Sequence, residues 1–356
     1  MRVPDLPKDV FVHEQRAGRV VFRDGALDDL AAETDRLGLT RVAAIAGPRH
    51  AGRTADVLSS RLVTAVEDAR MHVPVEQAEA VRAQCADAEA DGLVAVGGGS
   101  AVGLAKAVAL TLGIPIVAVP TTYSGSEMTR VWGISRDGVK RTGRDPVVAP
   151  RTVLYDPALF ATFPAVLAVP SAFNALAHAV EALYAPDRTP MTDLVAGEAV
   201  RRIIGALPRL ATDPEARSEA LRGAWLSGAA LDSTTMSLHH KLCHVLGGLG
   251  LSHASAHTVV LPHVLAYNAG AAPQAADVVA TALGRPGAEA GLALHELAVT
   301  MAAPTRLRDL GLRHDALDDV ARGVLASPYA NPAPVEETAV RALLERAWRG
   351  SVPGSL

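Results

Sequence analysis

Residues 93–119 read LVAVGGGSAVGLAKAVALTLGIPIVAV, and this stretch decides the fold class. Two short apolar runs, Leu93–Val96 and Ile114–Val119, flank a segment from Ala101 to Leu112 that is rich in alanine and leucine. Short continuous apolar runs are typical of strands covered on both faces, and the segment between them favours a helix. The stretch therefore predicts one strand–helix–strand unit of a parallel sheet.

The same alternation extends through the first 156 residues. We expect strands at residues 19–22, 41–46 and 71–75 and helices at residues 25–37, 51–68 and 76–91. Such alternation predicts a doubly wound, Rossmann-like α/β domain over residues 1–157.

Beyond Asp156-Pro157, strand-like runs almost disappear. Helical patterns cover residues 171–184, 191–207, 218–234 and 237–246 and most of the chain from residue 275. We expect an all-helical domain over residues 158–356, with a ligand-binding cleft between the two domains.

Composition argues against several classes of protein. The 356 residues are 49% hydrophobic and 20% charged with a net charge of −4, which favours neither nucleic acid nor an anionic membrane as a partner. Cys85 and Cys243 are too few for a disulfide framework. Residues 1–10 lack an apolar signal segment, and the longest apolar run, residues 107–120, is too short to span a bilayer. We therefore expect a cytoplasmic protein.

Gly97-Gly98-Gly99-Ser100 lies where the strand at 93–96 ends and the next helix begins. Glycine allows a ligand to approach the backbone closely, and a helix N-terminus offers N–H groups to phosphate. The spacing is not G-x-G-x-x-G, so a tight turn that binds no ligand is the alternative. We predict that these four residues bind the phosphates of a nucleotide and that Lys106 faces solvent.

Hydroxyl groups follow the strand at 114–119, at Thr121, Thr122 and Ser126. Open α/β sheets bind ligands at the carboxyl ends of their strands, so we assign these side chains to the same nucleotide site. A polar loop closed by local hydrogen bonds is the alternative.

Six of the twelve histidines fall within residues 239–263, and His240 and His244 are four apart on one face of a predicted helix. Asn174 and His178 are also four apart, on an apolar helix where asparagine is unfavourable without a partner. Imidazoles from two elements predict a functional pocket. Solvated surface histidines and a satisfied polar pair in the core are the alternatives.

Four blocks of sequence together resemble the iron-containing alcohol dehydrogenase superfamily and, within it, the maleylacetate reductase branch. They are residues 97–106, 121–129, 140–146 and 239–248. The resemblance covers nearly the whole chain and implies a dehydroquinate synthase-like fold with NADH or NADPH as the cofactor. It adds Lys140 to the cofactor-binding residues, and we expect a homodimer.

The resemblance also implies a site in the helical domain. Metal-dependent members hold iron or zinc with one Asp and three His, and the matching positions here are Asn174, His178, His240 and His253. Asparagine removes the only anionic ligand, so we expect the metal to be absent or optional, with zinc or iron at the three histidines if one binds. The expected catalytic residues are Asn174, His178, His240, Lys241, His244 and His253.

Two positions depart from the family pattern. The segment between His244 and His253 is one residue shorter than expected, so His257 competes with His253 for the same role. Ala333 stands in Asn331-Pro-Ala-Pro334 where the family motif has Arg, which weakens the case for maleylacetate itself if that Arg meets a substrate carboxylate.

The branch implies NAD(P)H-dependent reduction of maleylacetate, or of a close unsaturated oxo-dicarboxylate, to 3-oxoadipate in aromatic-compound catabolism. Hydride arrival at carbon pushes charge onto a conjugated oxygen, which protonated imidazoles or Lys241 could stabilise. The alternatives are a metal-dependent alcohol or polyol dehydrogenase of the same fold, a lyase related to the sugar-phosphate cyclases, and a non-catalytic nucleotide binder. Gly47 leaves no acid to reject a 2′-phosphate and Arg49 lies near, so use of both nicotinamides is expected.

Overall fold

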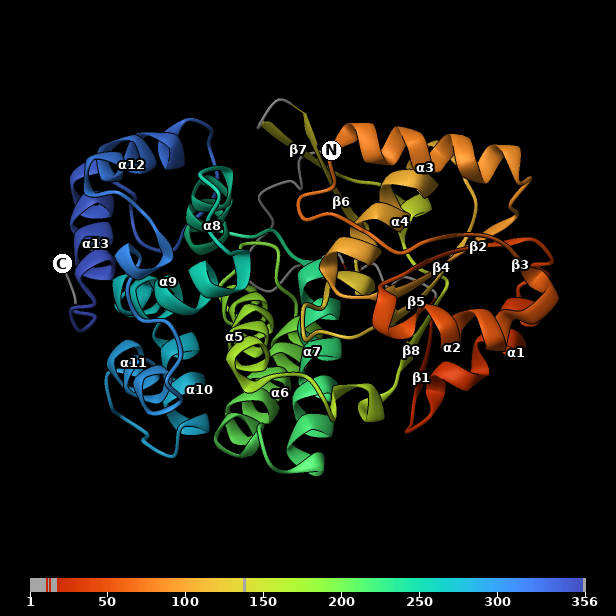
Figure 1. The fold of residues 1–356 in the computed structure, drawn as a ribbon. Coiled ribbons are helices and arrows are strands. Elements are labelled where there is room, and N and C mark those ends of the chain that lie inside the picture. The colour runs from red at the N-terminus through yellow and green to blue at the C-terminus, as the bar shows by residue number, and fades with distance from the viewer. Residues whose placement is uncertain (1–10, 12, 14–17, 137–138, 355–356) are drawn as a thin grey trace. The chain divides into compact units, whose positions relative to one another are not determined.

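The computed structural model describes residues 11, 13, 18–136 and 139–354, without the side chains of residues 139 and 140. The chain divides into two compact units (Figure 1). One spans Arg16–Phe163, and the other spans Pro164–Leu356 together with Met1–Gln15.

The unit Arg16–Phe163 is built on a six-stranded sheet in which every strand pairing is parallel. The order is β1-β8-β5-β4-β2-β3, with β1 (Arg19–Phe22), β2 (Val42–Ala46), β3 (Leu62–Val66), β4 (Gly92–Gly97), β5 (Ile116–Pro120) and β8 (Thr152–Tyr155). The chain runs from β2 to one edge at β3, returns to β4 and then continues toward the other edge. The direction therefore reverses between β2 and β4, the place where open α/β sheets bind ligands at the carboxyl ends of their strands.

Helices cover both faces of this sheet, α1 and α2 on one side and α3 and α4 on the other (Figure 1). Val94 and Val96 of β4 share a hydrophobic core with Leu30 of α1 and Leu58 of α2, whereas alternate residues of the strand face the opposite side. Burial on both faces explains the continuous apolar runs, and the predicted doubly wound parallel sheet is confirmed. The helices are α1 (Leu30–Arg36), α2 (Pro48–Leu58), α3 (Val75–Asp87) and α4 (Gly99–Leu112).

Two local predictions near residue 60 are wrong. The predicted helix at 51–68 ends early, because residues 62–66 form the edge strand β3. The predicted strand at 71–75 lies outside the six-stranded sheet and contributes one isolated bridge, from Pro74 to Ser135. β3 pairs only with β2 and its residues are half-buried or exposed, so it lacks the apolar run that marks the central strands.

An antiparallel hairpin of β6 (Val131–Arg136) and β7 (Val139–Arg144) was not predicted from the sequence. β6 is only partly buried and most residues of β7 are polar, so the hairpin carries no clear strand pattern. Gly143 pairs with Trp132, and a Cβ at Gly143 would lie 2.7 Å from the indole ring. The glycine therefore makes room for the tryptophan side chain.

The second unit is helical, as predicted. It contains α5 (Ala165–Ala182), α6 (Pro190–Ala206), α7 (Pro214–Ser233), α8 (Leu238–Gly248), α9 (His253–Asn268), α10 (Pro273–Ala282), α11 (Ala290–Thr300), α12 (Leu317–Leu325) and α13 (Glu337–Arg349). Among the described helices, α5 alone is long and apolar enough to cross a membrane, and 83% of that window is buried inside the protein. α5 packs against α6, α7 and α9, as a core helix does.

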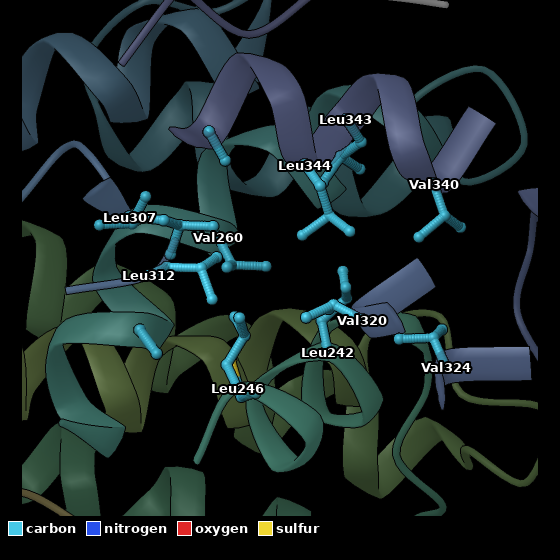
Figure 2. Packing of buried hydrophobic residues seen from close by; sticks show 14 of the residues in the cluster. Leu242, Leu246, Val260, Leu307, Leu312, Val320, Val324, Val340, Leu343 and Leu344 are labelled. Atoms are coloured by element: carbon cyan, nitrogen blue, oxygen red, sulfur yellow. The ribbon is translucent and has the colours of Figure 1, made fainter. Parts of the chain in front are cut away.

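α8 presents two chemically different faces. Leu238, Leu242 and Leu246 recur every four residues and are fully buried in a core shared with α9, α12 and α13 (Figure 2). His240 and His244 lie two positions further on, which places them on the opposite side of the helix. Packing of the leucine face therefore fixes the direction in which the histidines point.

Candidate functional site

The glycine turn joins β4 to α4. Gly98 is the N-cap of α4 and no described side chain caps the helix. The Thr121 N–H donates to the Gly97 carbonyl oxygen at 3.0 Å, which holds the loop after β5 beside the turn. Both loops thus lie at the carboxyl edge of the sheet, next to the reversal between β2 and β4. An uncapped helix N-terminus at this place suits a phosphate group.

Gly98 and Gly99 serve different purposes. A Cβ at Gly98 would lie 2.9 Å from Thr122 Cγ2, so glycine is needed there for packing within the protein. A Cβ at Gly99 would meet nothing within 4 Å. The space beside Gly99, at the start of a helix, fits the close approach of a dinucleotide pyrophosphate.

The prediction that Lys106 faces solvent is wrong, because Lys106 is 1% exposed. Its Nζ donates to the carbonyl oxygens of Ser126 at 2.6 Å, Thr129 at 2.7 Å and Val131 at 2.9 Å. It also lies 2.9 Å from Thr129 Oγ1. A buried ammonium needs such partners. Lys106 therefore ties α4 to the loop that carries Ser126.

The remaining predicted cofactor residues surround this loop. Thr121 and Thr122 are half-buried, and the hydroxyl oxygens of Ser124 and Ser126 lie 3.4 Å apart. Beneath them, burial raises the pKa of the Glu127 carboxyl group, which accepts a hydrogen bond from the Tyr155 hydroxyl at 2.7 Å. The Lys140 side chain lies outside the described residues.

In the helical unit, α5, α8 and α9 gather six imidazoles, those of His178, His239, His240, His244, His253 and His257. Ring centroids are 4.8 Å apart for His178 and His240, 5.0 Å for His240 and His257, and 4.4 Å for His253 and His257. His244 joins at the edge, 6.3 Å from His253. The structure thus gathers the four predicted histidines and also places His257 among them.

A row of hydrogen bonds runs through the cluster. His257 Nδ1 lies 2.8 Å from His239 Nε2, and His257 Nε2 lies 3.1 Å from His253 Nε2. Burial lowers the pKa of His239 to about 3 and the pKa of His178 and His257 well below its usual value, with neighbouring imidazoles adding to the effect. These inner rings are therefore neutral at physiological pH.

Glu181 is a site residue that the sequence reasoning missed. It is fully buried on α5, three residues after His178, and its Oε2 lies 2.6 Å from His240 Nδ1. Its oxygens also accept the backbone N–H groups of Ser237 at 3.0 Å and His239 at 2.8 Å, at the start of α8. Burial alone would raise its pKa, but His240 and the N–H donors outweigh burial and lower it. The sequence did contain a signal for Glu181, because an acidic residue is unusual in an apolar helix and this one lies three positions after His178.

Four polar atoms of the cluster are buried and have no hydrogen-bond partner within the described part of the chain. They are Asn174 Oδ1, His178 Nδ1, His239 Nδ1 and His240 Nε2. Buried polar atoms are normally satisfied, so their grouping in this cluster fits a place where a ligand binds.

The positions that the resemblance implies for iron or zinc do not form a preassembled set of ligands. Asn174 supplies no charge, and the ligand atoms of His178, His240 and His253 are not all within 4.8 Å of one another. Over the described ranges, the one group of His, Cys or acidic residues that meets this limit is His239, Cys243 and His257. In that group His239 Nε2 is already bonded to His257 and lies 3.7 Å from Cys243 Sγ, so its ligand atoms satisfy one another.

Two basic residues of the segment lie elsewhere. Lys241 Nζ donates to Ser327 Oγ and lies 5.9 Å from the centre of the Tyr329 ring. Adjacent residues of a helix face different directions, which separates Lys241 from His240. His263 is buried near His295, with ring centroids 6.2 Å apart. The six histidines of residues 239–263 therefore do not form a single group.

Comparisons with known proteins match the whole chain. Residues 17–157 match the family model of iron-containing alcohol dehydrogenase, and residues 168–348 match its C-terminal counterpart. The maleylacetate reductase of Burkholderia cepacia is 47% identical over 352 residues, covering 97% of this chain and 99% of the relative.

Solved structures agree in fold and length. A putative alcohol dehydrogenase from Ralstonia eutropha has a TM-score of 0.94 and 48% identity, with 97% of this chain and 99% of that chain covered. Maleylacetate reductase from Agrobacterium tumefaciens has a TM-score of 0.91 and 42% identity over the same shares of the two chains.

Proposed function

Because the chain belongs to the iron-containing alcohol dehydrogenase family, we propose that it is an oxidoreductase that reduces the carbon–carbon double bond of maleylacetate with NADH or NADPH, giving 3-oxoadipate. The observation that carries this proposal is its 47% identity to a maleylacetate reductase over nearly the full length of both chains. Asn174 supports it, because a neutral side chain stands where a metal-dependent dehydrogenase needs an anionic ligand.

We assign the cofactor to residues 1–157, with Gly97, Gly98, Gly99, Ser100, Thr121, Thr122, Ser126 and Lys140 as its binding residues. The uncapped start of α4 and the open space beside Gly99 support this assignment. A bound nicotinamide supplies the hydride. The Gly47 turn after β2 carries no acid and Arg49 is exposed beside it, which favours acceptance of both nicotinamides.

We assign the substrate to the histidine cluster within residues 158–356. Asn174 Oδ1, His178 Nδ1 and His240 Nε2 are three of the buried atoms of this cluster that have no partner among the described residues. Reduction places negative charge on the conjugated oxygen, and an imidazole N–H beside that oxygen stabilises the charge. The more exposed His244 is placed to exchange a proton with water and deliver it to the neighbouring carbon. His253 and His257 hold the inner rings through their hydrogen bond.

Lys241 and Ala333 bear on the two carboxylates of the substrate. Lys241 reaches the Ser327–Tyr329 segment, close in sequence to Ala333, and not the histidine rings. Its role in this proposal is to attract one carboxylate from that side, which would offset the absence of Arg at position 333.

The test uses purified protein of known metal content with maleylacetate and each nicotinamide, followed by the loss of nicotinamide absorbance. The proposal expects turnover with a metal-free preparation and 3-oxoadipate as the product. No turnover with either cofactor, in a protein that binds both, would count against it.

A metal-dependent alcohol dehydrogenase is the second candidate, because the neighbour from Ralstonia eutropha is described as a putative alcohol dehydrogenase. Alcohol oxidation that disappears with chelator and returns with stoichiometric zinc or iron would favour it.

We also propose that the protein is a cytoplasmic homodimer. Cell fractionation would test its location, and light scattering would test its oligomeric state.

A further inference from the structure

The buried Glu181 carboxylate makes three contacts, and one of them determines how His240 is held. The carboxylate joins the C-terminal end of α5 to the start of α8 through the Ser237 and His239 N–H groups. Its remaining contact is with His240 Nδ1 at 2.6 Å. Glu181 therefore joins two helices that are far apart in the sequence. It does so beside His240, whose Nε2 has no hydrogen-bond partner among the described residues.

We infer that Glu181 is a positioning residue that holds His240 with a proton on Nδ1 and turns Nε2 toward the substrate. An ionised carboxylate only accepts hydrogen bonds, so the ring nitrogen beside it must donate. A nitrogen fixed in this way determines what the other nitrogen offers. If the ring turned over, Nδ1 would lose this partner and the buried carboxylate would keep only its two backbone N–H donors.

The same contact gives the site its buried anion. Glu181 occupies the far side of His240 from the partnerless Nε2, whereas a metal centre of the family would carry its carboxylate at position 174, among the ligands. The negative charge therefore acts on the imidazole and not on a ligand in the site. In the neutral ring Nε2 is then a hydrogen-bond acceptor, and it donates to a developing oxyanion only after it has taken up a proton. The Glu181 carboxylate on the other side of the ring stabilises the imidazolium formed in this way.

The inference on orientation can be tested on the native enzyme without substrate. We would label the histidines with 15N, record long-range 1H–15N correlations, and assign His240 by the signals lost in His240→Asn. The expected result is a protonated Nδ1. A bare Nδ1 with a protonated Nε2 would overturn the inference. Because no substrate is used, failure of the proposed reaction does not affect this result.

The effect on turnover rests on the proposed function and is tested with Glu181→Gln. The amide has one acceptor and one donor, so in either orientation its NH2 group meets a backbone N–H or displaces the His240 proton. We expect kcat to fall by about 100-fold or more, while the KM for NADH stays unchanged. Glu181→Asp keeps the charge and should recover part of the lost rate.

Glu345→Gln provides the matched control, because Glu345 holds His314 on the exposed surface at 2.9 Å. That variant should retain the native kcat. A Glu181→Gln enzyme with the native melting temperature and the native kcat would refute a role in turnover. If Glu181→Gln does not fold, the 15N spectrum of the native enzyme decides the question.

Discussion

At the level of single residues, Asn174 is the clearest difference between this site and a metal centre. Its Oδ1 is buried without a partner and it lies one turn from His178. Asn174→Asp should raise zinc affinity by about tenfold or more, because it adds an anionic oxygen ligand. Competition with a chromophoric chelator would measure this affinity, with Asn174→Ala as the control. Unchanged zinc affinity in a folded Asn174→Asp protein would show that this side chain does not face the site.

Gly99 offers a test of cofactor placement that Gly98 does not. A Cβ at position 98 would collide with Thr122 whatever the ligand, whereas a Cβ at position 99 has no protein atom within 4 Å. Gly99→Val should therefore raise the KM for the nicotinamide at least about tenfold with little change in melting temperature, because the added side chain fills the phosphate space. Gly52→Val, at an exposed and equally open glycine of α2, is the control. Equal cofactor KM values for the two variants would contradict the placement.

At the level of elements, Lys106 connects α4 to the loop after β5. Lys106→Met should lower the free energy of unfolding by about 3 kcal/mol, because three carbonyl groups, all buried or part-buried, lose a charged donor. Urea denaturation measures the change. Lys241→Met removes one hydrogen bond to Ser327 Oγ and the contact with the Tyr329 ring near the surface, and should cost much less. Similar losses for the two variants would mean that the Lys106 bonds contribute little.

Sequence reasoning found the elements whose pattern is local. The central strands β4 and β5 are buried on both faces and read as apolar runs, and α8 carries its leucine stripe every four residues. The edge strand β3 and the hairpin β6–β7 were missed, because partial burial leaves no such pattern. β3 is placed by its pairing with β2, and β6 and β7 are placed by their pairing with each other.

The candidate functional site was also predicted only where its residues form a local sequence pattern. The histidines were predicted because they cluster in sequence and share a helix face. Glu181 was missed because its partner His240 is 59 positions away, and only the packing of α5 against α8 and α9 reveals the contact. Lys106 was misplaced because helical periodicity alone does not show which loop covers a helix.

At the level of the whole molecule, buried neutral histidines make stability depend on pH. Burial lowers the pKa of His263 to about 3, with His295 adding to the shift, and lowers that of His239 to about 3. Between pH 6.5 and pH 3 the unfolded chain binds protons at these positions that the folded chain does not. The stability that these two neutral histidines contribute is therefore fully present above pH 6.5 and is lost as the pH drops toward 3.

His263→Leu isolates one of these contributions away from the histidine cluster. The His263 Nε2 atom is buried without a partner, so an apolar side chain of similar size loses no hydrogen bond at that atom. Each such histidine adds about 1.4 kcal/mol per pH unit to the slope of the unfolding free energy plotted against pH. Between pH 6 and pH 4 the slope of the His263→Leu variant should therefore be smaller than the native slope by that amount. Urea denaturation at half-unit steps measures both slopes, and the comparison between pH 7 and pH 8, where neither form binds the proton, is the control. Parallel slopes across the acid range would mean that His263 takes up its proton in the folded protein, and that burial does not keep it neutral.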